Sequence, residues 1–263
     1  MNISSLLSGT TSSLLGSGTT ASQATAATSS VSPFLAQAEK RIQADADVTT
    51  AQISKFGLVK SALSDGQAAA KAMSTLSSTS TAADATSALG NFFNTFNASV
   101  SAANAASTAT GTGSESERAK RLVLDLKSAL SSDPAIADDM KKLGLTVQPD
   151  GSLVQDPKKF AASLAADPSG TLAAMAKVGS KVDSVSSKEL SSSGTVGSAL
   201  AALNAQSTSL TADQSALKAL DQAMAAVSAA DPFTATDTSS QSSTSSSLFG
   251  SGLAAYQSNM TGF

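Results

Sequence analysis

A mostly apolar residue recurs at every seventh position near each end of this 263-residue chain. The N-terminal row contains Leu35, Ile42, Thr49, Phe56, Leu63 and Ala70, and the C-terminal row contains Val196, Leu203, Leu210, Leu217 and Met224. Seven residues make two turns of an α-helix, so each row forms a stripe along one helix face. The rows therefore predict two long helices, and their stripes need a partner: each other, neighbouring copies of the chain, or both.

Large apolar side chains are scarce, which limits the width of any core. The chain has nine Phe, one Tyr and no Trp, and much of its apolar fraction is Ala. Alanine favours helix and allows helices to pack closely. We therefore predict a mainly α fold, an elongated helical bundle or coiled coil with one small β-hairpin-containing unit and disordered termini.

The composition excludes several kinds of active site. The chain has no Cys and no His, so it has no disulfides, thiol nucleophiles or Cys/His zinc sites. We find neither a Ser/His/Asp set nor a phosphate-binding glycine loop. The net charge of -3 argues against nucleic-acid binding, and no apolar run is long enough for a transmembrane helix. We expect a protein that is not an enzyme and binds no metal, cofactor or nucleic acid.

Changes in composition divide the chain into five parts. The leader is uncharged and polar, and Ser32 and Pro33 read as the N-cap and first residue of the helix that follows it. The parts are a disordered leader that is a possible export signal (1–33), an N-terminal long helix (34–76), a central helical unit (77–190), a C-terminal long helix (191–230) and a Ser-rich disordered tail (231–263).

The first half of the central unit predicts two amphipathic helices. One starts near Asp84, and the other starts in SESERAKR, whose charges we interpret as a solvated helix start. The first has the apolar stripe Leu89, Phe92, Phe93, Phe96 and Val100, and the second has Leu122, Val123, Leu126 and Leu130.

The second half of the central unit has the clearest turn signals. Asp133-Pro134 predicts the start of a short helix that ends at Leu143-Gly144. Alternating apolar residues on both sides of a Pro-Asp-Gly turn then predict a β-hairpin near 143–155. Asp156-Pro157 and Asp167-Pro168 read as the starts of two further helices.

The segment LGLTVQPDGSLVQDPKKFAASLAADP, residues 143–168, resembles the C-terminal signature of the bacterial flagellar filament-capping proteins, also called hook-associated protein 2. The segments 52–73, 91–97 and 216–229 are similar to further helices of that family, in the same order. The residues that match the signature include Gly144, Asp150, Gly151, Leu153, Asp156, Asp167 and Pro168. The family's large inserted β-rich domains have no counterpart here, because only the linker near 74–88 occupies their place.

The resemblance implies a secreted, extracellular structural protein of the bacterial flagellum, in a reduced hook-associated or filament-capping form. Its expected partners are copies of itself, flagellin or other hook-associated proteins, and the flagellar type III export machinery. The absence of Cys and the low aromatic content suit a chain that is exported unfolded. The assembly seam would be Leu35, Ile42, Phe56, Leu63, Val196, Leu203, Leu210, Leu217 and Met224.

Two other readings remain open. Ala-rich amphipathic helices are also typical of phasin-type proteins, which coat hydrophobic granules and need no export. Alternatively, the chain is an export substrate that acts as an adhesin or an effector.

Overall fold

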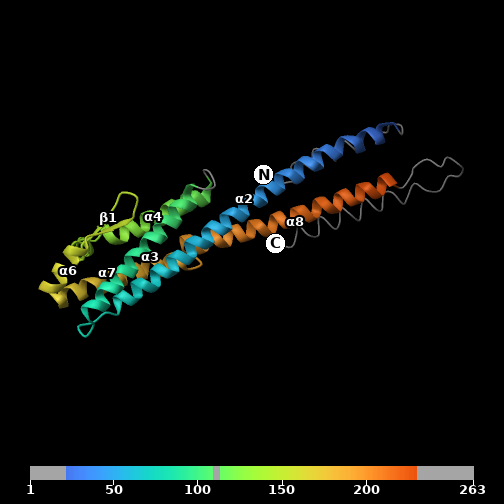
Figure 1. Cartoon of the computed structure of the whole chain (residues 1–263). Helices are drawn as coiled ribbons and strands as arrows, with labels where there is room; N and C mark the ends of the chain where they lie inside the picture. Colours follow the sequence, from blue (N-terminus) through green and yellow to red (C-terminus); the bar gives the residue numbers. More distant parts are fainter. Residues whose placement is uncertain (1–21, 109–112, 230–263) are drawn as a thin grey trace. The chain divides into compact units, whose positions relative to one another are not determined.

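The computed structural model describes residues 22–108 and 113–229 (Figure 1). The elements are α2 (Ser22–Ser74), α3 (Ala82–Thr108), α4 (Ser114–Ser131), α5 (Pro134–Lys142), β1 (Leu145–Val147), β2 (Leu153–Gln155), α6 (Pro157–Ala166), α7 (Pro168–Leu190) and α8 (Thr195–Ala229). The prediction of a mainly α fold with one small antiparallel hairpin is confirmed. The expected disorder concerned residues 1–33 and 231–263; residues 1–21 and the tail lie outside the described residues, whereas 22–33 belong to α2, so for them the prediction is wrong.

The chain divides into two compact units. One unit consists of residues 45–209. The described part of the other unit is the beginning of α2, up to Ala44, and the end of α8, from Leu210. Helices α2 and α8 each continue from one unit into the other.

The predicted start of the first long helix is wrong. Ser32 and Pro33 were expected to begin it, but α2 begins at Ser22 and contains Pro33. Residues 22–32 contain no glycine and no proline, so nothing in them stops a helix. A proline inside a helix removes one backbone hydrogen bond, at a cost of about 3 kcal/mol. A helix as long as α2 can accommodate that loss, so the N-cap signal at Ser32 does not decide where α2 begins.

The unit of residues 45–209 has one continuous apolar core. The predicted stripe of α3 is buried at Leu89, Phe92, Phe96 and Val100, whereas Phe93 is only partly buried. The rings of Phe92 and Phe96 lie 5.8 Å apart, centroid to centroid. Residues from every helix around them join this core, including Phe56 and Leu63 of α2, Leu122 and Leu126 of α4, Met175 and Val178 of α7, and Val196 and Leu203 of α8.

Small residues let α2 approach its neighbours closely. Gly179 of α7 lies against the backbone of α2, and a Cβ atom there would be 2.9 Å from the Ser74 nitrogen. On another face of α2, the Ser99 hydroxyl of α3 donates a 2.8 Å hydrogen bond to the carbonyl of Ala62. Gln67 adds hydrogen bonds to Asp183 and Ser187 of α7. These contacts hold α3 and α7 on α2 within this unit.

The three Asp-Pro pairs of the central unit begin helices as predicted. The side chain of Asp133 accepts from the Ala135 nitrogen, that of Asp156 from the nitrogens of Lys158 and Lys159, and that of Asp167 from the Gly170 nitrogen. In each case proline follows directly, at a position where its missing N–H would have had no helical partner. None of the helices in the described ranges is long and apolar enough to span a membrane.

Candidate functional site

The hairpin of β1 and β2 contains Asp150, Gly151 and Leu153, three of the residues that match the family signature. Its strands pair antiparallel, with Val147 opposite Leu153 and Leu145 opposite Gln155. The turn is held by the Asp150 carboxylate, which accepts hydrogen bonds from the Ser152 hydroxyl (2.7 Å) and nitrogen (3.0 Å). These two bonds, the hydroxyl first, lower the pKa of Asp150 below its ordinary value of 3.8.

The two glycines of the hairpin have positive φ angles, which side chains rarely allow. Gly144 has φ +68° and Gly151 has φ +88°. Space is also limited, because a Cβ on Gly144 would lie 2.5 Å from the Asp156 carbonyl oxygen. A Cβ on Gly151 would lie 2.8 Å from Cγ1 of Val123 in α4. Glycine is therefore required at 144, where the chain passes from α5 into β1, and at 151, where the turn of the hairpin packs on α4.

Asn97, the last residue of the matching segment 91–97, fixes the hairpin to α3. The Asn97 side chain donates from Nδ2 to the Leu153 carbonyl oxygen at 3.0 Å. Its Oδ1 accepts from the Leu153 nitrogen at 2.7 Å. The amide thus pairs with the outer edge of β2 as a neighbouring strand would. Asparagine is a poor residue for a helix interior, and that was the available signal.

The other matched residues also have structural positions. Leu153 is buried in the core, and Asp156 and Asp167 cap α6 and α7. The pKa of Asp167 is lowered, chiefly by the Gly170 N–H and then by the Ser169 hydroxyl. Pro168 is the first residue of α7. The matched residues build and dock the hairpin, and they bring no set of reactive side chains together.

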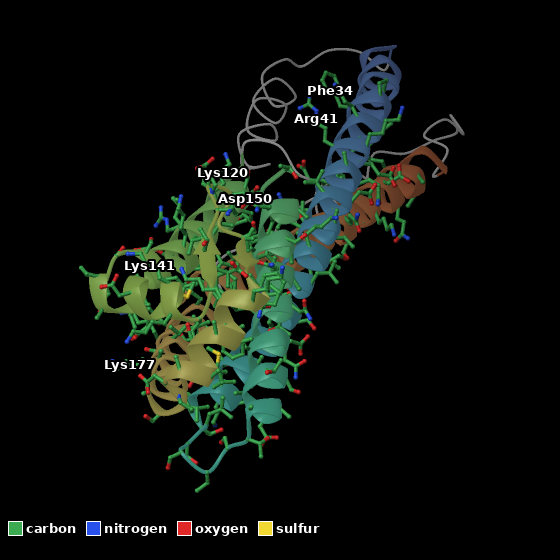
Figure 2. All side chains as sticks on the ribbon, turned by 60° about the vertical axis from the view of Figure 1, so that its left-hand side comes forward. Phe34, Arg41, Lys120, Lys141, Asp150 and Lys177 are labelled. Atoms are coloured by element: carbon green, nitrogen blue, oxygen red, sulfur yellow. The ribbon has the colours of Figure 1, made fainter. Side chains whose placement is uncertain are left out.

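The N-terminal row is buried along most of α2. Within residues 45–209, Thr49, Phe56, Leu63 and Ala70 are each at most 1% exposed. The buried Thr49 hydroxyl has a hydrogen-bond partner, because it donates to the Asp45 carbonyl oxygen at 2.7 Å. In the other unit, Ile42 is buried but Leu35 is only half-buried. Its neighbour Phe34 is 60% exposed, and Figure 2 shows it projecting from α2.

The C-terminal row is likewise buried within residues 45–209 and less buried outside them. Val196 and Leu203 are fully buried within residues 45–209. In the other unit, Leu210, Leu217 and Met224 are half-buried. There Gln214 of α8 donates to Gln43 of α2 at 3.3 Å, so the two helices lie side by side. Two helices alone cannot enclose a wide apolar stripe, which explains the incomplete burial.

A charged group lies among these half-buried residues. Asp213 is one turn after Leu210 and is itself half-buried. Loss of water around its carboxyl raises the pKa of Asp213 above its ordinary value of 3.8. A carboxylate at such a position opposes tight packing at neutral pH.

Among the described residues no group of three or more acidic side chains is placed to hold a metal ion. No family model, curated protein or solved structure matches the chain.

Proposed function

We propose that this chain is a secreted, non-enzymatic structural protein of the bacterial flagellum, hook-associated or filament-capping-like, that assembles through its two long helices. One observation carries the proposal. The seven-residue rows continue beyond the well-packed unit of residues 45–209 into helix segments where their burial is incomplete. A stripe that keeps its period where the described part of its own chain leaves it half-buried would suit further helices.

The energetic gain per contact is small. Completing the burial of one half-buried Leu or Met contributes roughly 1 kcal/mol, about half the value for full burial. The residues concerned are Leu35, Leu210, Leu217 and Met224. Their sum is comparable to the lower values for the cost of associating two molecules. Isolated pairs would therefore be weak, and stable association would require several copies or a preformed array of axial proteins.

The partners proposed are copies of this chain, flagellin or other hook-associated proteins, reached through the flagellar type III export machinery. The resemblance of four segments, in the same order along residues 34–230, supports this choice. A chain with no cysteine also suits export in an unfolded state. The hairpin also agrees with the resemblance. Asp150 and Gly151 form its turn, and Gly144 stands between α5 and β1, as in the matching signature.

A second candidate is a coat protein on hydrophobic granules. The half-buried rows, together with exposed Phe34, would also adsorb on an apolar surface. The two candidates differ in location, since a coat protein stays in the cell and a flagellar protein requires the export gate.

The test combines sedimentation of the purified chain over a concentration series with a paired substitution. Leu217→Asn introduces an amide into the half-buried row, whereas Leu58→Asn makes the same change at a side chain that is 61% exposed and off the row. We expect the average mass to rise with concentration, and to rise less for Leu217→Asn than for Leu58→Asn.

A secretion assay in cells with and without a working flagellar export gate completes the test. Gate-dependent appearance in the medium agrees with the proposal. A chain that stays monomeric at all concentrations and is retained on granules would refute it and favour the coat protein.

A further inference from the structure

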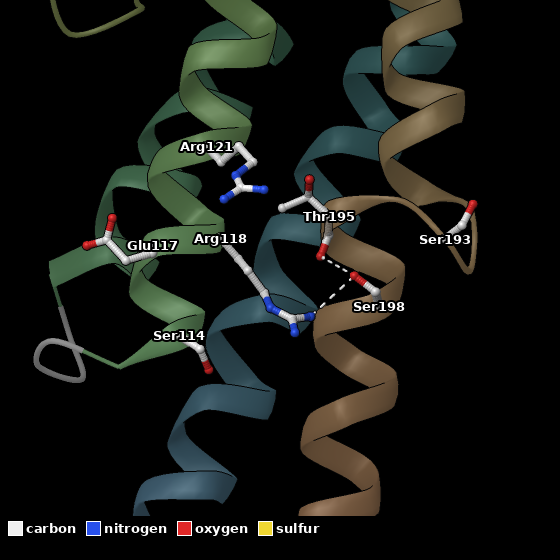
Figure 3. A pocket seen from close by; sticks show the side chains of 7 residues that line it. All are labelled: Ser114, Glu117, Arg118, Arg121, Ser193, Thr195 and Ser198. Carbon is white, nitrogen blue, oxygen red and sulfur yellow. Dashed lines mark hydrogen bonds between the residues drawn. The ribbon is translucent and has the colours of Figure 1, made fainter.

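A polar pocket lies between α4 and the turn that leads from α7 into α8, within the unit of residues 45–209 (Figure 3). Its volume is about 440 Å³. Arg118, Arg121 and Glu117 of α4 line one side, and Ser193, Thr195 and Ser198 line the other. As predicted from the sequence, these charges lie at a helix start where Glu117 and Arg121 are exposed, but Arg118 is half-buried beside α8.

The two arginines give the pocket a positive charge. Arg118 is half-buried and its Nη1 donates to the Ser198 hydroxyl at 3.3 Å. Arg121 makes no hydrogen bond or ion pair with any residue in the described ranges. Figure 3 shows both guanidinium groups directed from α4 toward α8.

The nearby carboxylates are engaged elsewhere. Glu117 points away from the two guanidinium groups in Figure 3 and pairs with Lys120 at 2.7 Å. Glu189 is buried and does not line the pocket; its Oε2 accepts from the Thr195 nitrogen at 3.0 Å. Within the described part of the chain, neither arginine is paired with an acidic side chain.

We propose that this pocket is a binding site for a carboxylate group. A guanidinium presents parallel N–H donors that match the two oxygens of a carboxylate, and the hydroxyl of Thr195 in the pocket lining supplies a further donor. Glu117 at the rim adds a negative charge, which disfavours a dianion such as phosphate more than a monoanion. The site is independent of the assembly rows, so it can exist whether or not the proposed function is correct.

The plain structural alternative is that Arg118 only holds α4 to α8. Arg121 separates the two possibilities, because its exposed side chain makes no hydrogen bond or ion pair with any described residue. Arg121→Gln should therefore leave the melting temperature unchanged and still remove half of the positive charge. Arg41→Gln is the matched control, since Arg41 is an exposed arginine outside this unit (Figure 2).

The experiment is a titration of the full chain with sodium acetate at constant ionic strength, followed by amide chemical shifts. We expect saturable shifts at 114–121 and 193–198, an affinity about tenfold weaker for Arg121→Gln, and wild-type affinity for Arg41→Gln. Arg121→Lys should recover only part of the loss, because lysine keeps the charge without the paired donors. Glu117→Gln should tighten the binding of inorganic phosphate more than that of acetate.

Two blocked peptides distinguish the source of the carboxylate. One has a glutamate side chain and an amidated end, and the other has only a free C-terminal carboxylate. Tighter binding of either peptide than of acetate identifies that source. The proposal is overturned if Arg121→Gln binds acetate as well as the wild type does, or if chloride and phosphate compete as well as acetate.

Discussion

Replacing Gly179 by alanine should push α7 away from α2. The added Cβ would overlap the carbonyl oxygen of Ala70, and it would lie 2.9 Å from the Ser74 nitrogen and 3.3 Å from the Met73 carbonyl carbon. These are backbone atoms inside a helix, so they cannot rotate aside. An ordinary contact is restored only if the helices separate by roughly 1 Å, which forfeits up to about half of the dispersion energy of the contacts between them.

Two opposing terms set the size of the effect. Overpacking of a core typically costs about 1–3 kcal/mol, and the rigid backbone here places Gly179→Ala at the upper end. Alanine returns about 1 kcal/mol through its higher helix propensity. The net loss is therefore about 1–2 kcal/mol, and for a unit of this size that lowers the melting temperature by about 2–8 °C.

Gly57→Ala is the matched control. Gly57 lies in α2, is exposed and would have nothing within 4 Å of an added Cβ. The propensity term then acts alone, and we expect a gain of about 0.5–1 kcal/mol. Thermal and urea unfolding followed by circular dichroism would give both values. If Gly179→Ala proved as stable as Gly57→Ala, the close approach of α7 to α2 would be wrong.

Two further substitutions test other contacts. Asn97→Ala leaves the Leu153 N–H and carbonyl without their partner, so it should lower the free energy of unfolding in urea by about 1–3 kcal/mol. The control Asn104→Ala removes only a 3.4 Å hydrogen bond to the Asp150 carbonyl at an exposed turn, and it should cost about 0.5 kcal/mol or less. Equal losses would contradict the assigned role of Asn97. Asp213→Asn should raise the melting temperature at neutral pH, because the raised pKa of Asp213 means that wild-type stability falls as pH rises from 3.8 through that pKa. The advantage should disappear below 3.8, and an advantage that persisted there would show that ionisation is not its cause.

Features that depend on adjacent residues could be predicted from the sequence. Asp133, Asp156 and Asp167 each stand directly before a proline, and the cap follows from that pair alone. The buried rows were predictable because helical period translates directly into one face. The seven-residue period placed Phe56 and Leu63 in the assembly seam, and in the structure both are buried in the chain's own core.

Features that depend on distant parts of the chain could not be predicted. Asn97 acts on Leu153, and Arg118 acts on Ser198, through contacts that exist only when α3, α4 and α8 are packed. The position of Gly179 on α2 has the same origin. The error at Pro33 has a different cause, since a local start signal was outweighed by the helix-compatible residues before it.

The amide of Asn97 also has a consequence for solubility. An exposed edge strand can pair with an extended segment of another molecule, and continued strand addition leads to insoluble fibrils. The Asn97 side chain occupies the hydrogen-bonding groups of Leu153 on the outer edge of β2, and a side-chain amide cannot continue the strand pairing. Copies of this chain that assembled through their helices, as proposed, would thus not join through their hairpins.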